Sequence, residues 1–205
     1  MDTSHRPTVG SSQSTSPSLL ERLKGNDSVA WEHFAAVYGP MVYGWCRRLG
    51  LQDQDAADVS QEVFRAVAGN IRRFRRDAAN HTFRGWLWTI TRNKIRDLGR
   101  DQAGKAHAQG GSTADARLQQ IAEPPDDVSS VSNDAVDGRG LLQRAADIIR
   151  SEFEEQTWQI FYQIVIEGRR ATDVAADLKM TASAVRQAKY RVLRRLRQEF
   201  DGLLD

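Results

Sequence analysis

Arginine and glutamine side chains gather near the carboxyl end of the chain, at spacings that place them on one face of a helix. Both residue types can form paired hydrogen bonds to guanine or adenine at the base edges of a DNA major groove. Arg186 and Gln187 are the residues best placed for this task. Spacings of three and four turn an apolar set toward a core: Val185, Ala188, Val192 and Leu196. The pattern indicates recognition of duplex DNA rather than catalysis.

This helix would be the second of a helix-turn-helix over residues 171–197. A short first helix would bury Val174, Ala175 and Leu178, and Thr181 is placed to cap the second helix. Early side chains of such a helix reach base edges, and later arginines hold phosphates. Any one of these residues, taken alone, would fit equally well on a solvent-exposed basic helix that does not bind DNA. The expected DNA-binding residues are Thr181, Ser183, Arg186, Gln187, Tyr190, Arg191 and Arg194, with Arg195 and Arg197 as further phosphate contacts.

A second basic region, residues 72–98, interleaves arginines with aromatic side chains. Aromatic rings stack on unpaired bases while arginines neutralise phosphates, so the pattern suits single-stranded DNA. Residues 77–83 are expected to form a loop, and a helix is expected from about Arg84. Taken alone, the two tryptophans would more often be core residues, and core packing is the favoured explanation for Trp86. Stacking on bases is the expectation for Phe83 and Trp88 in this basic context. The helix would carry a polar stripe of Thr89, Arg92, Asn93 and Arg96.

A third segment, residues 53–71, predicts a helix that begins with acidic side chains. Asp53 or Asp55 can cap this helix and interact favourably with its positive end. Four apolar side chains would face inward: Val59, Val63, Val67 and Ile71. A polar stripe would remain outside, made of Asp58, Gln61, Glu62 and Arg65. Taken alone, this stripe is most simply a solvated face.

Charge changes sign along the chain, although the formal net charge of its 205 residues is only +2. Residues 65–100 hold ten Arg or Lys against two acids, and residues 169–197 hold nine against two. Residues 101–137 reverse this balance, with seven acids against two bases.

The single cysteine, Cys46, forms no internal disulfide, and no Cys/His group has zinc-site spacing. With no signal peptide or apolar run of membrane-spanning length, we expect a cytoplasmic protein without membrane insertion.

The distribution of apolar residues predicts an all-α protein of two small helical domains, each with its own modest core. Pro40, Gly50, Gly69 and Gly85 are expected to mark breaks or close-packing points. The expected organisation is a disordered tail at 1–18, a helical domain at 19–100, a flexible acidic linker at 101–137 and a helix-turn-helix domain at 138–205.

Three ordered segments resemble the extracytoplasmic-function (ECF) subfamily of sigma-70 family RNA polymerase sigma factors. The first is Asp55-Ala-x-Asp-x-x-Gln-x-x-Phe64, and the second is Phe83-Arg-Gly-Trp-Leu-Trp-x-Ile-x-x-Asn93. The third runs from Asp173-Val-Ala to Val185-Arg. Together they place the resemblance over residues 19–98 and 138–196. One such motif is weak evidence, but three in the right order are strong.

The resemblance implies an alternative sigma factor that binds core RNA polymerase and directs promoter-specific transcription initiation, with no catalytic residues and no cofactor. The first domain would be sigma region 2-like, and the second would be region 4-like and read the −35 element as duplex. Expected protein partners are the clamp helices of the largest polymerase subunit, the flap of the second-largest subunit and an anti-sigma factor. The clamp helices would contact Asp55, Asp58, Gln61, Glu62 and Arg65.

For the melted −10 element of promoter DNA, the resemblance implies contacts from the predicted loop and from the helix after it. The acidic linker would thread the polymerase cleft, where its charge can occupy a nucleic-acid path. The residues implied for the −10 element are Asn80, His81, Phe83, Arg84, Trp88, Arg92, Asn93, Arg96 and Asp97.

The sequence departs from the common pattern at Lys179, where the family usually has a turn glycine, and at Arg170, where it usually has a Ser or Thr cap. Two other functions stay open. A helix-turn-helix regulator that never joins polymerase would bind an operator tightly by itself. A polymerase-binding adaptor that reads no DNA would show no sequence-selective initiation.

Overall fold

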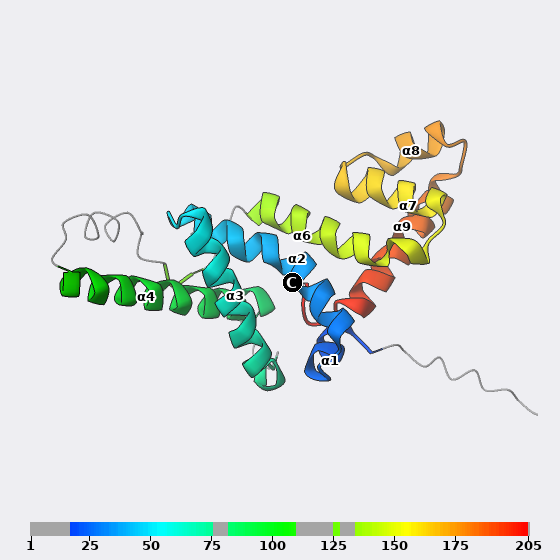
Figure 1. Cartoon of the computed structure of the whole chain (residues 1–205). Coiled ribbons are helices and arrows are strands. Elements are labelled where there is room, and N and C mark those ends of the chain that lie inside the picture. Colours follow the sequence, from blue (N-terminus) through cyan, green and yellow to red (C-terminus); the bar gives the residue numbers. More distant parts are fainter. Residues whose placement is uncertain (1–16, 76–81, 110–124, 128–133, 205) are drawn as a thin grey trace, which may run out of the picture.

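The described part of the chain consists of helices and their connections. The computed structural model describes residues 17–75, 82–109, 125–127 and 134–204, and these contain no strand, so the predicted all-α class is confirmed. The helices, shown in Figure 1, are α1 (Leu19–Lys24), α2 (Ser28–Arg48), α3 (Asp53–Asn70), α4 (Phe83–Gln109), α6 (Asp134–Ile149), α7 (Glu155–Phe161), α8 (Ala171–Asp177) and α9 (Ala182–Glu199). Short 3-10 turns at Ile71–Arg73 and Arg150–Glu152 and a π-helical turn at Tyr162–Ile166 connect them.

Polar side chains cap several of these helices. At α1, the Ser18 hydroxyl accepts a hydrogen bond from the Glu21 amide, and the Glu21 carboxylate accepts one from the Ser18 amide. Asp27 caps α2 through the amides of its first turn. The expected cap of α3 is wrong, because Gln52 stands at the cap position and forms no side-chain bond there. The two aspartates lie in the first turn instead, where they still favour the positive end of the helix.

Aromatic side chains fill the centre of the first three long helices. Phe34 of α2 is fully buried and meets Phe64 and Phe83 edge to face. Trp45 of α2 meets Trp88 of α4 in the same way, with ring centroids 5.4 Å apart. Edge-to-face pairs of this kind add to the stability gained from burial alone. The predicted inward face of α3 is confirmed by the burial of Val59, Val63, Val67 and Ile71.

Cys46 lies within the same core, beside Ser60 of α3. Burial raises the pKa of its thiol to about 12, because a thiolate would lose its hydration there. The side chain therefore remains a neutral thiol at physiological pH.

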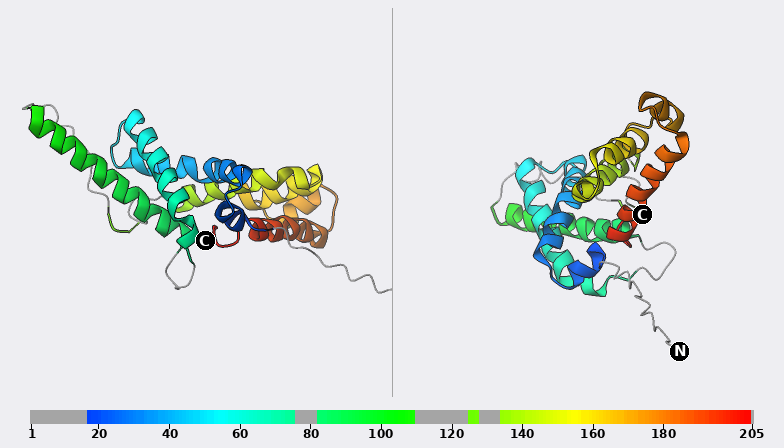
Figure 2. Two further views of the ribbon diagram at one scale, coloured as in Figure 1. Left: turned by 60° about the horizontal axis from the view of Figure 1, so that its bottom comes forward. Right: turned by 90° about the vertical axis from the view of Figure 1, so that its right-hand side faces the viewer.

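The two halves of the chain share one large apolar core, which differs from the expectation of a separate core in each. α6 lies alongside α2 (Figures 1 and 2), and Phe200 and Leu203 from the carboxyl end join the same buried cluster as the α2 aromatics. The Tyr38 hydroxyl donates to the Leu203 carbonyl at 2.6 Å, and Arg144 Nε donates to the Val37 carbonyl at 2.9 Å. Periodicity locates an apolar face but does not identify the helix it packs against.

The helices extend further than the sequence predicts. α4 continues to Gln109 and α6 begins at Asp134, so both ends of the expected linker at 101–137 are helical. Low apolar content suggested a linker, yet it does not stop a helix from continuing into solvent. Pro40 is likewise no break, since α2 runs through it. Among the described residues, no helix is long and apolar enough to cross a membrane.

Candidate nucleic-acid and polymerase interfaces

Helices α8 and α9 form the predicted helix-turn-helix. Val174 and Ala175 of α8 are buried, and they pack with Val185 and Ala188 of α9 in a small second cluster. The Thr181 hydroxyl accepts a hydrogen bond from the Ala184 amide at 3.2 Å, which confirms the predicted cap. This cluster holds α8 against the first turns of α9.

The turn between these helices keeps its shape although it lacks the usual glycine. Lys179 adopts φ of 52°, the left-handed region that glycine enters with least strain. Its amide donates to the Ala176 carbonyl and the Met180 amide donates to the Ala175 carbonyl, so the turn is closed by its own backbone. Arg170 occupies the cap position of α8 without a side-chain cap bond. Both departures are therefore accommodated at the level of the backbone.

The outer face of α9 is open to solvent. Arg186 and Gln187 are exposed, and Tyr190 keeps 58% of its surface accessible. Neither Arg186 nor Arg191 forms an ion pair with any described residue. The predicted residues Ser183, Arg186, Gln187, Tyr190, Arg191 and Arg194 all lie on this exposed side, with Thr181 at its start. The face therefore presents hydrogen-bond donors that the described part of the fold does not use.

Arg195 does not belong to this face, contrary to the expectation that it holds a phosphate. Its guanidinium binds both carboxylate oxygens of Glu152, at 2.6 and 2.8 Å, and donates to Glu199 at 2.9 Å. Partial burial works to lower the pKa of Arg195, but these hydrogen bonds outweigh it and the pKa is raised. Glu199 also binds Arg22 of α1 at 3.2 Å. Arg195 thus ties α9 to its neighbours.

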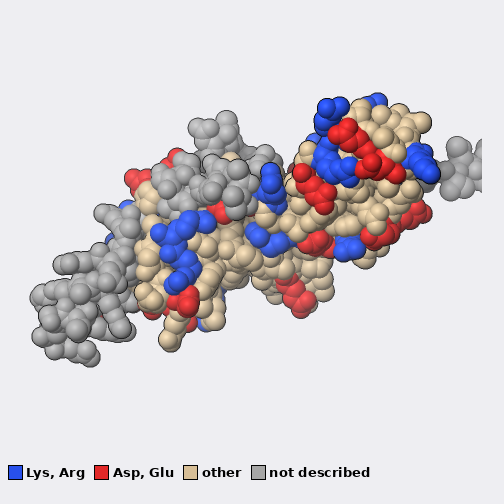
Figure 3. All heavy atoms as spheres, turned by 90° about the horizontal axis from the view of Figure 1, so that it is seen from above, with Lys and Arg blue, Asp and Glu red and all other residues tan. Residues whose placement is uncertain are grey.

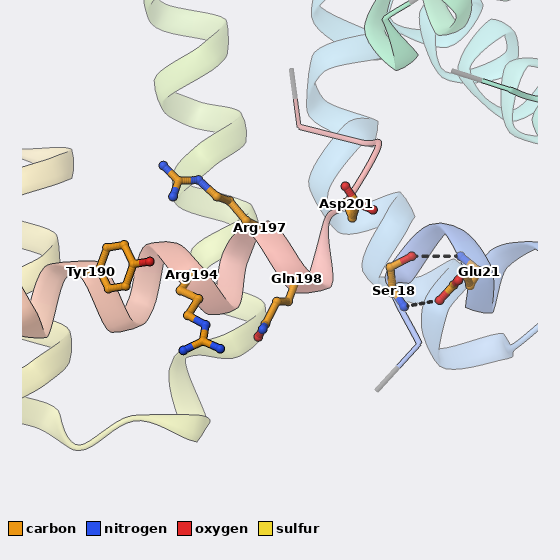
Figure 4. Close-up of a pocket in the computed structure, with 7 residues that line it drawn as sticks. All are labelled: Ser18, Glu21, Tyr190, Arg194, Arg197, Gln198 and Asp201. Atoms are coloured by element: carbon orange, nitrogen blue, oxygen red, sulfur yellow. Dashed lines mark hydrogen bonds between the residues drawn. The ribbon is translucent and has the colours of Figure 1, made fainter. Parts of the chain in front are cut away.

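A shallow hollow lies where α9 approaches the start of α1 (Figure 4). Tyr190, Arg194 and Arg197 line it from α9, and Ser18 and Glu21 line it from the other side. The carboxylate of Glu21 already bonds the Ser18 amide, as the dashed lines show. An acidic helix start therefore faces the later arginines of α9 across this hollow.

Phe83 and Trp88 of α4 are core residues, so the expectation that they stack on exposed bases is wrong. Phe83 is fully buried and its ring meets Phe34, Tyr38 and Phe74. Trp88 keeps only 1% of its surface accessible. Neither ring has a face free for a base. Trp86 packs against Phe74 and Phe83, which agrees with the core packing predicted for it.

The polar stripe of α4 is partly covered by the chain itself. Arg92 pairs with Asp126, and Arg96 approaches the same carboxylate at 3.9 Å. Asn93 and Asp97 are exposed, and Arg84 is half-buried with Asp137 4.0 Å away. The remaining predicted residues, Asn80 and His81, lie outside the described residues.

The stripe on α3 stands beside α4. Asp58 and Gln61 are exposed, and Asp55 is half-buried. Glu62 pairs with Arg65 on its own helix and with Lys94 of α4 at 3.6 Å. Seen from above, basic side chains form a band toward the α4 end of the molecule, while acidic and basic side chains alternate toward α8 (Figure 3). The structure thus brings the predicted α3 stripe together as one polar surface.

Sequence reasoning missed the acidic partners of these arginines. Asp126, Asp137 and Glu152 each bind an arginine that is distant in the chain, and no local pattern marks such pairs. Within the described ranges, no group of His, Cys, Asp and Glu could hold a metal ion. The chemistry of these surfaces is hydrogen bonding and charge.

Comparisons with known proteins show which family the chain resembles. Residues 34–104 match the family Sigma-70 region 2. ECF RNA polymerase sigma factor SigD of Mycobacterium tuberculosis (strain ATCC 25618 / H37Rv) is 31% identical over 170 residues, covering 78% of this chain and 72% of the relative. ECF RNA polymerase sigma factor ShbA of Streptomyces griseus is 29% identical over 190 residues, covering 87% and 92%. A solved structure of CnrH in complex with the cytosolic domain of CnrY is 20% identical and covers 87% of this chain and 92% of that one, with a TM-score of 0.35.

Proposed function

The chain belongs to the ECF RNA polymerase sigma factors, and from this premise we propose which surface performs each part of transcription initiation. As an alternative sigma factor it joins core polymerase, which supplies catalysis in the cytoplasm, and it supplies promoter recognition. The observation that carries the proposal is the exposed face of α9, where Arg186 and Gln187 form no hydrogen bond or ion pair with the other described residues.

We assign recognition of the duplex −35 element to this face. The first turns of α9 pack Val185 and Ala188 into the α8–α9 core, and their opposite, exposed face carries the side chains able to read base edges. Arg191 and Arg194 follow one and two turns later, where they would bind phosphates. The helix-turn-helix geometry supports this order along the groove.

We assign capture of the melted −10 strand to α4. Arg92 and Arg96 offer guanidinium groups to phosphates, and exposed Asn93 offers an amide to a base. Since Phe83 and Trp88 are buried, strand capture by the described residues would rest on charge and hydrogen bonds. Affinity should therefore fall steeply with salt.

We assign docking on the polymerase clamp helices to the α3 stripe. Asp58 and Gln61 are exposed on a helix that the core holds firmly through its valines. A polar face on a rigid helix suits a partner helix that carries complementary charge. The docking face and the α9 face are both accessible in the same structure.

The test is reconstitution of the full chain with core RNA polymerase, followed by mapping of transcription starts across genomic DNA. We expect core binding and starts at a defined promoter set. Asp58→Lys should lose core binding while keeping its fold, and Glu32→Gln, a charge change at an exposed site of α2, should change neither. Failure of the wild-type chain to bind core would overturn the proposal, and binding without selective starts would instead indicate an adaptor.

A further inference from the structure

The segment Pro125–Asp127 lies along the surface of α4 that we assign to the −10 strand. The Trp88 indole N–H donates to the Pro125 carbonyl at 3.2 Å, and Asp126 pairs with Arg92 and approaches Arg96 at 3.9 Å. Trp88, Arg92 and Arg96 are four residues apart, so they form one row along the helix. The segment therefore follows this row.

The contacts in this row are those that a nucleic-acid backbone would make. Guanidinium groups bind carboxylates and phosphates through the same planar arrangement of N–H donors. Asp126 puts one carboxylate between two arginines, as a phosphate would stand. The side chains of Arg92 and Arg96 are only 18% and 31% exposed, so a second anion would compete with Asp126 for the accessible part of this row.

We propose that the segment at Asp126 is an internal competitor for single-stranded DNA, which must displace this carboxylate to reach Arg92 and Arg96. The proposal rests on the assignment of α4 to the melted strand. With Asp126 in place, the free protein should bind single-stranded DNA more weakly than it would if Arg92 and Arg96 were uncovered. No described segment covers the α9 face in this way, so we expect the competition to be confined to single strands.

A DNA strand can displace the Asp126 carboxylate reversibly. The Asp126 side chain is 91% exposed, and an exposed ion pair of this kind is weak and screened by salt. Its strength comes from the tether, because a segment of the same chain is present at high effective concentration. A strand held in place by other contacts can therefore displace it, whereas a stray strand must compete with it.

The test uses the full-length protein without polymerase and a fluorescein-labelled 20-nucleotide oligonucleotide of mixed sequence, single-stranded or as a duplex. Asp126→Asn should tighten single-strand binding by about 3- to 10-fold at low salt, the range expected from losing one or two exposed ion pairs. Duplex binding should not change. The single-strand gain should shrink at high salt, and fluorescence anisotropy measures each affinity.

Glu32→Gln provides the matched control, since it removes one negative charge from an exposed site of α2. An equal gain with Glu32→Gln, or an equal gain for duplex DNA, would show an effect of net charge and overturn the proposal. No gain with Asp126→Asn would overturn it as well. Urea unfolding of both variants checks that the fold is retained.

Arg92→Ala separates this proposal from the function on which it rests. If α4 holds the melted strand, Arg92→Ala lowers promoter-dependent initiation with core polymerase and cancels the gain of Asp126→Asn. Reduced initiation without any Asp126→Asn effect would overturn the competitor alone. Unchanged initiation with Arg92→Ala and Arg96→Ala combined would remove the assignment of α4 itself.

Discussion

Helices α4 and α9 both carry arginine-rich faces, but they are built in opposite ways. α9 keeps its apolar side chains on one side and exposes Arg186 and Gln187 on the other. On α4 the aromatic side chains are buried, and Arg92 is covered by the carboxylate of Asp126. The face that we assign to duplex DNA is open, whereas the face that we assign to unpaired DNA lies against the core and an acidic residue of the same chain.

This difference separates stability from recognition. If α9 binds DNA as proposed, substitutions on its exposed face should remove DNA contacts and leave the core intact, because surface changes of this kind have small effects on stability. Substitutions on α4 should affect the core, the ion pairs and the proposed DNA contacts together. A variant of the exposed α9 face that destabilises the fold, or a core variant of α4 that does not, would contradict this difference between the two helices.

The largest effect is expected from the aromatic residues of the two helices. Phe83→Ala should lower the free energy of unfolding by about 3–5 kcal/mol, because it leaves a cavity among four aromatic rings. Tyr190→Ala, at a side chain that is 58% exposed, should change it by less than about 0.5 kcal/mol. Urea unfolding followed by circular dichroism measures both values.

Phe83→Leu tests the same site if the alanine variant does not fold. It should lower the free energy of unfolding by about 1 kcal/mol, since most of the buried volume is kept. A Phe83→Ala protein with wild-type stability and lost initiation would mean that the ring contacts DNA. That result would remove the contrast between the two helices.

A smaller effect is expected for base recognition by α9. Arg186→Ala should reduce discrimination between promoters that differ in the upstream element by about 1–3 kcal/mol, the worth of a good bidentate base contact. Its stability should stay at the wild-type value. In vitro transcription from paired templates measures the discrimination, and Glu32→Gln serves as the exposed-site control. An unchanged promoter preference would show that Arg186 does not contact bases of the −35 element.

The sequence predicts the α9 face well because an amphipathic helix is a local pattern. The three- and four-residue spacing of Val185, Ala188, Val192 and Leu196 determines which side is buried, and all four are buried. The capping box of Ser18 and Glu21 was equally readable, since Ser-x-x-Glu before an apolar run is a helix-start signature. It lay at the edge of a region expected to be a tail.

The α4 surface could not be predicted in the same way. An aromatic residue among arginines suits a core and a stacking platform equally, and only the packing partners of Phe83 decide between them. The pairing of Arg92 with Asp126 joins residues 34 positions apart, and that of Arg195 with Glu152 joins residues 43 apart. Such pairs depend on how helices pack, which hydrophobic periodicity does not encode.

The smallest expected effect concerns two residues in left-handed conformation, one in each half of the chain. Lys179 has φ of 52° and Asn26 has φ of 61°. Lys179→Gly should raise the free energy of unfolding by about 0.5 kcal/mol, because relief of strain exceeds the added freedom of the unfolded chain. Asn26→Gly should raise the free energy of unfolding by less, since asparagine tolerates this conformation. Thermal unfolding should show a rise of about 1–2 °C for Lys179→Gly, and a larger rise for Asn26→Gly would contradict the difference in strain between the two turns.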